Sequence, residues 1–164
     1  MAQTKAWLVC VILAITLTGG WGALTWLRTR PLIPASGGCG PKSLLAVSRR
    51  LGVHTDAHQV FALFGGEVTM SNFSEMQRPA QQLGLNTQGF WMNVDELHRR
   101  HPLGILHIGP THFVGLTGYA PNGVEVVDPE VQNWAKETTQ FWSDEDLASR
   151  WDGRILVVSR KGTP

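Results

Sequence analysis

Residues 6–27 form 22 consecutive positions without a charged side chain, and this segment constrains the chain more than any other feature. Basic residues bound it, with Lys5 on one side and Arg28 and Arg30 on the other. At 1.5 Å per helical residue, 22 positions span about 33 Å, which matches a bilayer core of about 30 Å. Trp7 and Trp26 stand near the two ends, where indole rings favour the membrane–water interface. The sequence therefore predicts one apolar helix ahead of the rest of the chain.

Two interpretations of this segment stay open. An uncleaved single-pass anchor fits its length, Trp26 and the flanking arginines. A cleaved signal needs an apolar core of about 7–15 residues. Residues 8–16 supply that core, but Gly20-Trp21-Gly22 is a poor cleavage site. We expect a signal-anchor or signal peptide over residues 1–27 and a single-pass membrane protein, with export after signal cleavage as the alternative.

Charge is unevenly distributed over the 164 residues. Only 16% of them are charged, whereas about a quarter is typical of soluble domains. The first 55 residues carry six basic and no acidic groups, and the other 109 carry eight basic and 13 acidic groups, so +6 and −5 give the net +1. Because no even basic surface follows from this division, we do not expect a nucleic-acid partner.

Beyond a connector at residues 28–38, the chain reads as one domain over residues 39–164. Apolar spacing and capping residues predict helices over 39–51, 55–63, 72–83 and 93–100, the third strained or restarted at Pro79. The period then changes, and strands are expected over 103–108, 112–119, 124–128 and 154–159, with a hairpin turn at 120–123 and a helix over 143–151. Helices followed by antiparallel strands predict an α+β fold.

Cys39 is the most informative residue for chemistry. It follows two glycines, precedes Gly40-Pro41 and opens a predicted helix, whose N-terminal N–H groups stabilise a thiolate. The other cysteine, Cys10, lies in the apolar segment, so we expect no disulfide within the domain. A small buried apolar cysteine fits the same pattern, and spacing alone does not separate the two interpretations.

His112 and Asp128 are the candidate partners of Cys39. A cysteine nucleophile needs a base, and the base needs an orienting group. His112 begins one predicted strand and Asp128 ends the next, so antiparallel pairing returns the carboxylate towards the imidazole. A polar residue at a strand end and an Asp-Pro turn are the plainer interpretations of these two positions.

Three blocks together resemble a known family: CGPKSLLAVSRRLGV (39–53), HFVGLTGYAPNGVEVVDP (112–129) and FWSDEDLASRWDGRILVV (141–158). They are similar to the bacteriocin-processing, double-glycine-leader cysteine peptidases, whose papain-like domain often stands at the front of peptide-exporting ABC transporters. The resemblance implies a papain-like fold with N-terminal helices packed on an antiparallel sheet. It also implies cleavage after paired glycines in a leader peptide, through an acyl-enzyme and without a cofactor. Cys39 would be the nucleophile, His112 the general base and then acid, and Asp128 the orienting carboxylate, with a peptide-export transporter as the implied partner.

One position departs from the family pattern. Ile33 stands about six residues before Cys39, where the family usually has a glutamine whose side-chain amide stabilises the oxyanion. Losing one such donor typically costs about 10²–10³ in rate. A catalytically weak or inactive module that binds leader peptides for a transporter is therefore the alternative, and acyl transfer to another acceptor is a third.

Cofactors receive no support from the sequence. His98 and His101 have helical i, i+3 spacing and His107 lies near His112, but no further zinc ligands stand at suitable spacing. We therefore expect no metal site. The sequence also lacks a G-x-x-x-x-G-K-[ST] phosphate loop, so ATP binding is not expected.

Overall fold

The computed structural model describes residues 38–66, 72–130 and 138–162, and all of them belong to one compact unit. The predicted apolar helix, most of the predicted connector and Ile33 lie outside the described residues. No helix among the described residues is long and apolar enough to cross a membrane.

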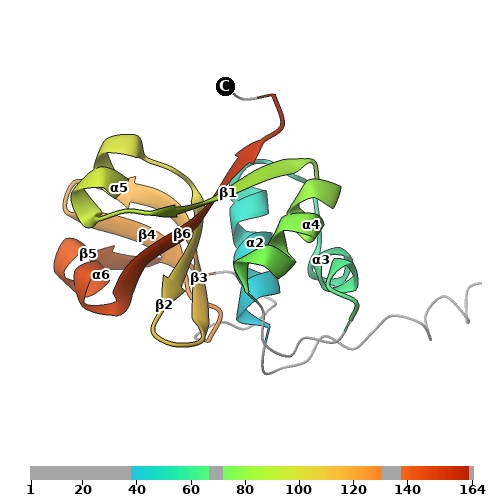
Figure 1. The fold of residues 1–164 in the computed structure, drawn as a ribbon, viewed down its shortest axis with the longest axis horizontal. Coiled ribbons are helices and arrows are strands. Elements are labelled where there is room, and N and C mark those ends of the chain that lie inside the picture. Colours follow the sequence, from blue (N-terminus) through green and yellow to red (C-terminus); the bar gives the residue numbers. More distant parts are fainter. Residues whose placement is uncertain (1–37, 67–71, 131–137, 163–164) are drawn as a thin grey trace, which may run out of the picture. The chain divides into compact units, whose positions relative to one another are not determined.

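Helices dominate the first part of the described chain and strands the second (Figure 1). The helices are α2 (Cys39–Arg50), α3 (Ala57–Leu63), α4 (Phe73–Gln82), α5 (Val94–Arg100) and α6 (Asp144–Arg150). The strands are β1 (Leu85–Trp91), β2 (Gly104–Ile108), β3 (His112–Ala120), β4 (Gly123–Val127), β5 (Gln140–Ser143) and β6 (Trp151–Arg160).

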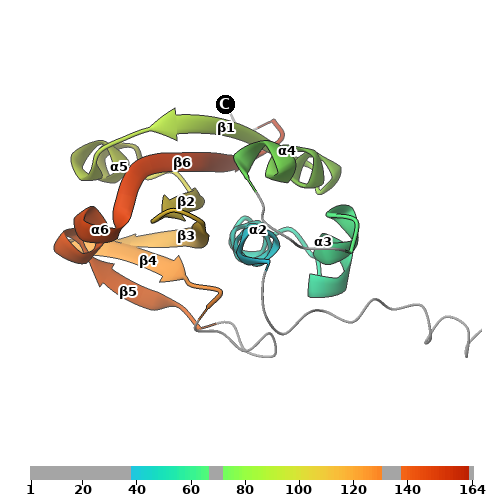
Figure 2. The same cartoon turned by 60° about the horizontal axis from the view of Figure 1, so that its bottom comes forward.

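The strands form one sheet in the order β1-β6-β2-β3-β4-β5, and every neighbouring pair is antiparallel. The helices α2, α3 and α4 gather on one side of the unit, as Figures 1 and 2 show. The predicted α+β class and the packing of N-terminal helices on an antiparallel sheet are therefore confirmed. The hairpin is confirmed as well, since Ala120 pairs with Gly123 across the turn between β3 and β4.

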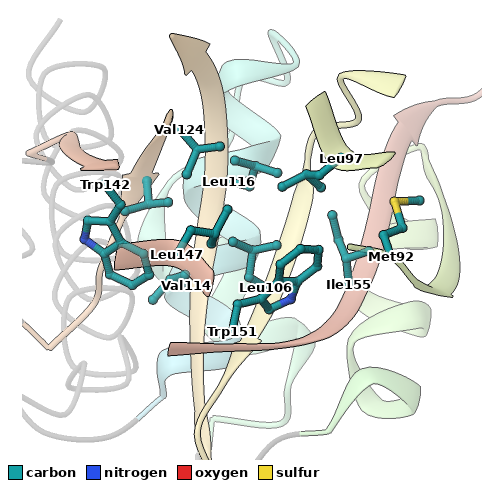
Figure 3. Packing of buried hydrophobic residues seen from close by; sticks show 11 residues of the cluster. Met92, Leu97, Leu106, Val114, Leu116, Val124, Trp142, Leu147, Trp151 and Ile155 are labelled. Carbon is teal, nitrogen blue, oxygen red and sulfur yellow. The ribbon is translucent and has the colours of Figure 1, made fainter. Parts of the chain in front are cut away.

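The sheet has a hydrophobic cluster on each face, because successive strand residues point to opposite sides. Leu106 of β2 packs with residues of α5 and α6, whereas Ile105 beside it packs with residues of α2 and α4. Figure 3 shows the first cluster, which comprises Met92, Leu97, Leu106, Val114, Leu116, Val124, Val126, Trp142, Leu147, Trp151 and Ile155. The second comprises Leu44, Val47, Met76, Ala80, Leu85, Ile105, Phe113, Leu156 and Val158.

Local capping signals locate the helix starts well. The α4 helix begins with a capping box in which the Asn72 side chain accepts from Glu75 N–H and the Glu75 carboxylate accepts from Asn72 N–H. Asp56 and Gln59 form the same arrangement before α3. The expected interruption of the helix at Pro79 was wrong, since α4 runs through this buried residue to Gln82. Met76, Pro79 and Ala80 are all buried, so this part of the helix is packed against the rest of the unit.

Two strands were missed and one was predicted too short. The sequence of β1, LNTQGFW, has no clean alternation, and β5 has only four residues, yet both pair along the sheet edges. The last strand starts at Trp151, three residues before the expected position. Gly153 adopts a left-handed φ of 88° within it, and a Cβ there would lie 3.0 Å from Met92 O.

Helix α2 lies directly against β3, and glycine makes this approach feasible. A Cβ at Gly115 would lie 3.2 Å from Ser43 O and 3.3 Å from the Ala46 side chain. The buried Ser43 hydroxyl donates to Phe113 O at 3.0 Å. This contact fixes the N-terminal half of α2 beside the start of β3, which determines where Cys39 lies.

Candidate active site

Cys39 is the first residue of α2 and is partly exposed. The residue before it, Gly38, has a left-handed φ of 76°, a conformation that favours glycine. The Cys39 thiol lies 3.8 Å from Thr111 O, although 72 positions separate the two residues in the chain. The helix start therefore presents the thiol to the residues that precede β3.

His112 and Asp128 meet across the β3–β4 hairpin. His112 is the first residue of β3, and Asp128 directly follows β4. The strands pair with Gly115 opposite Val127, so the end of β4 returns to the start of β3. His112 Nε2 lies 2.9 Å from Asp128 Oδ1, and both side chains are largely buried. The predicted contact between the carboxylate and the imidazole is therefore present.

The three side chains shift one another's protonation. Burial opposes ionisation of Cys39, but hydrogen bonds to His112 and to backbone N–H groups outweigh it, so the pKa of Cys39 lies below its ordinary value. Burial alone would lower the pKa of His112, but its hydrogen bonds to Asp128 and Cys39 raise that pKa to about 9. Contact with His112 likewise outweighs burial at Asp128 and lowers the pKa of that carboxyl. These directions favour a thiolate beside an imidazolium.

Glu130 is a functional candidate that sequence reasoning missed. Its N–H donates to Asp128 Oδ1 at 3.0 Å, and its Oε1 lies 3.5 Å from His112 Nδ1. One ring nitrogen of His112 therefore contacts the Asp128 carboxylate and the other contacts the Glu130 carboxylate. The position of Glu130 two residues after Asp128 is the only sequence signal, and it does not reveal the direction of the side chain.

The histidines with zinc-like spacing have other contacts. His98 pairs with Asp144 and His107 with Asp152, each at 2.6 Å, while the His101 ring packs on Tyr119 with centroids 4.7 Å apart. Within the described ranges, no group of three or more His, Cys, Asp or Glu side chains is placed to hold a metal ion.

The arrangement has the parts of a nucleophilic site: a thiol of lowered pKa at a helix start, a base, and a carboxylate that orients the base. The model of the peptidase C39 family matches residues 35–163. The chain belongs to this family. It thus contains a cysteine peptidase-like domain, and the resemblance seen in the three sequence blocks is confirmed.

Solved structures show the same papain-like fold. The chain is similar to a double-glycine-motif protease from an AMS/PCAT transporter, solved with the leader peptide, at 22% identity and a TM-score of 0.62. That match covers 82% of this chain and 96% of the other. The peptidase domain of Streptococcus ComA, a bifunctional ABC transporter of a quorum-sensing pathway, matches at 20% identity and a TM-score of 0.62, with coverages of 80% and 96%.

The chain is also similar to a protein that has no assigned activity. An uncharacterized protein of Methanothermobacter marburgensis is 23% identical over 124 residues, which are 75% of this chain and 82% of the relative.

Proposed function

We propose that this chain is a cysteine endopeptidase that cleaves peptides through an acyl-enzyme on Cys39. The observation that carries the proposal is the contact of 2.9 Å between His112 Nε2 and Asp128 Oδ1. With Nε2–H donated to Asp128, Nδ1 is the nitrogen that exchanges a proton with Cys39. The lowered pKa of Cys39, where the His112 hydrogen bond outweighs burial, supports the same pairing.

The reaction follows from these roles. The Cys39 thiol gives its proton to His112 Nδ1, and the thiolate attacks the scissile carbonyl carbon. The tetrahedral oxyanion accepts a hydrogen bond from the Cys39 backbone N–H and then collapses as His112 protonates the leaving amine. A water molecule, deprotonated by His112, attacks the thioester and releases the peptide acid and the free thiol.

We propose leader peptides with paired glycines as the substrates, cut after the second glycine, and a peptide-export transporter as the partner. Family membership supports this substrate class, because the similar solved domains come from a double-glycine-motif protease and from a bifunctional ABC transporter. The fold match by itself supports neither assignment, since one fold hosts many activities.

The test uses the full chain and a peptide that contains Gly-Gly. We expect hydrolysis after the second glycine and alkylation of Cys39, and we expect Cys39→Ala to abolish both. Cys10→Ala is the matched control, because it removes the other cysteine of the chain and should leave hydrolysis unchanged. Full hydrolysis by Cys39→Ala contradicts the mechanism.

A binding module that holds leader peptides without cutting them is the second candidate, favoured by Ile33 in place of the family's glutamine. The variant Ile33→Gln distinguishes a weak peptidase from a binding module. For a weak peptidase, the added amide donor should raise kcat by about 10²–10³. For a binding module, the peptide binds, no product forms with either variant, and Cys39→Ala leaves the affinity unchanged.

We also propose that residues 6–27 anchor the chain in a membrane, from their length and lack of charge. Carbonate extraction of membranes should leave the full chain in the pellet, and its mass should include residues 1–27. A released chain that starts after residue 22 identifies export after signal cleavage instead.

A further inference from the structure

A pocket of about 230 Å³ begins next to the candidate nucleophile. Thr111 lines this pocket, and the carbonyl oxygen of the same residue lies 3.8 Å from Cys39 Sγ. Phe113, which directly follows His112, also lines it. The pocket therefore shares Thr111 with the surroundings of Cys39, although the proposed mechanism does not use it.

Aromatic rings form much of the wall. The rings of Phe73 and Phe113 have centroids 5.3 Å apart and are tilted by 48°, and Pro110 adds a third apolar surface. Both rings also meet His107 edge-on, at 6.4 and 5.2 Å. Such walls favour a flat apolar side chain, because offset and edge-to-face ring contacts add to the energy of burial.

A polar group of three side chains completes the pocket. His107, which is only 7% exposed, lies 2.6 Å from Asp152 Oδ2, and Arg154 Nη2 lies 2.8 Å from His107 Nδ1. Arg154 Nε and Nη2 both bind Asp152. Within the part of the chain that the structure describes, Arg154 Nη1 has no hydrogen-bond partner, so it can donate to an oxygen brought in by a ligand.

Building on the proposed function, we propose that this pocket is a substrate subsite for a tyrosine-like side chain, with the ring against Phe73, Phe113 and Pro110 and the oxygen accepting from Arg154. An extended peptide advances about 3.3 Å per residue. Because Thr111 joins the pocket to Cys39, the bound residue lies within three positions of the scissile bond. The two glycines at the scissile bond have no side chains for the enzyme to recognise. The pocket thereby adds selection for a large side chain at a nearby position of the substrate.

The test is a positional scan with the full chain. Peptides carry Gly-Gly at the scissile bond, and each of the other positions within three residues of that bond is in turn Gly, Phe or Tyr. At one position we expect kcat/KM to rise at least about ten-fold from Gly to Tyr, with Phe between them, because a hydrogen bond to a charged donor is worth about ten-fold or more. Equal rates for the three residues at every position overturn the proposal, and so does equality of Phe and Tyr.

Two variants locate the preference. Phe73→Trp narrows the pocket and should remove the advantage of Tyr over Gly. Arg154→Met removes the donor and should make Tyr and Phe equal. Phe141→Trp is the matched control, since Phe141 is 58% exposed on β5 and is not among the residues that line this pocket, and it should keep the wild-type preference. A Tyr preference that survives both pocket variants contradicts the assignment.

Peptide binding separates failure of the subsite from failure of the proposed function. If no peptide is cut, the proposed activity is wrong, and the anisotropy of labelled peptides on Cys39→Ala still tests the pocket. The Tyr peptide should then bind at least about ten-fold more tightly than the Gly peptide, and less tightly after Arg154→Met. Equal affinities overturn the subsite whether or not the chain is a peptidase.

Discussion

Glu130 places a carboxylate oxygen 3.5 Å from Nδ1 of His112, the ring nitrogen that does not contact Asp128. The imidazole therefore has a carboxylate at each nitrogen, one largely buried and one 75% exposed. The buried carboxylate fixes the orientation of the ring. The exposed one stands beside the nitrogen that must exchange a proton with Cys39, so it acts on the proton affinity of that nitrogen.

Glu130→Gln should lower the pKa of His112. Burial lowers that pKa and hydrogen bonds raise it to about 9, with the Glu130 charge also contributing upwards. An exposed ion pair is worth about 0.2–1 kcal/mol, which corresponds to a decrease of about 0.2–0.7 pH unit. The NMR titration of His112 and the alkaline limb of kcat/KM should both shift by this amount.

The control for Glu130→Gln is Asp95→Asn, an exposed acid in the first turn of α5. Besides Glu130, the groups that act on His112 are Asp128 and Cys39, and Arg150 acts on Asp128. Apart from Glu130 itself, none of these groups changes in either variant. Added salt should shift the alkaline limb of the wild-type kcat/KM profile towards that of Glu130→Gln, because ions screen exposed charges. No shift with Glu130→Gln, or an equal shift with the control, contradicts the interpretation.

Alkylation of Cys39 should report its lowered pKa directly. Burial opposes ionisation, but hydrogen bonds, with His112 the largest, outweigh it, so the iodoacetamide rate should reach half its maximum at a lower pH than it does for an ordinary cysteine thiol. His112→Ala removes that hydrogen bond and should move the midpoint upwards. Mass spectrometry of the modified peptide distinguishes Cys39 from Cys10. An unchanged midpoint would show that His112 does not stabilise the thiolate.

The Cys39–His112 pair should contribute little pH dependence to the stability of the wild type near neutral pH. The lowered pKa of Cys39 and the raised pKa of His112 favour a thiolate and an imidazolium in the folded state, which together hold one proton. The unfolded state holds a thiol and a neutral imidazole, which also hold one proton, so the two states differ little in bound protons.

Cys39→Ser should remove this compensation. In this variant His112 stays protonated in the folded state, mainly because of its hydrogen bond to Asp128. In the unfolded state the same imidazole loses its proton above about pH 6.5. Because the folded pKa is raised, the stabilisation is fully present below that pH and is lost as pH rises through the folded pKa. The free energy of unfolding should fall by at most about 1.4 kcal/mol per pH unit. Urea denaturation from pH 6 to 9 measures this slope, and equal slopes in both proteins contradict the ion pair.

Gly115→Ala should separate α2 from β3. The new Cβ would lie 3.2 Å from Ser43 O, and overpacking of this kind costs about 1–3 kcal/mol. Displacement of α2 also moves Cys39, so the alkylation midpoint should rise along with the loss of stability. Gly89→Ala in β1 is the matched control, because a Cβ there meets nothing within 4 Å, and it should leave both quantities unchanged.

Local signals in the sequence were sufficient for the helix starts and the central hairpin. The capping box of Asn72 and Glu75 involves residues three positions apart, and the turn after Ala120 joins strands that follow one another directly. Interactions of such short range are encoded in neighbouring residues. Strands β1 and β5 could not be predicted in this way, because their pairing with distant strands, and not their own residue pattern, makes them strands.

The residue types and order of the candidate site, Cys39 before His112 before Asp128, were determined by the sequence alone, as was the uncharged segment 6–27. The tertiary structure decided their distances. Close packing of α2 on Gly115 and the register of β3 with β4 bring together residues that lie up to 89 positions apart in the chain. It also decided the position of Glu130 at the second nitrogen of His112 and the pocket beside Thr111. Contacts between side chains depend on how separate elements pack, and no short stretch of sequence contains that information.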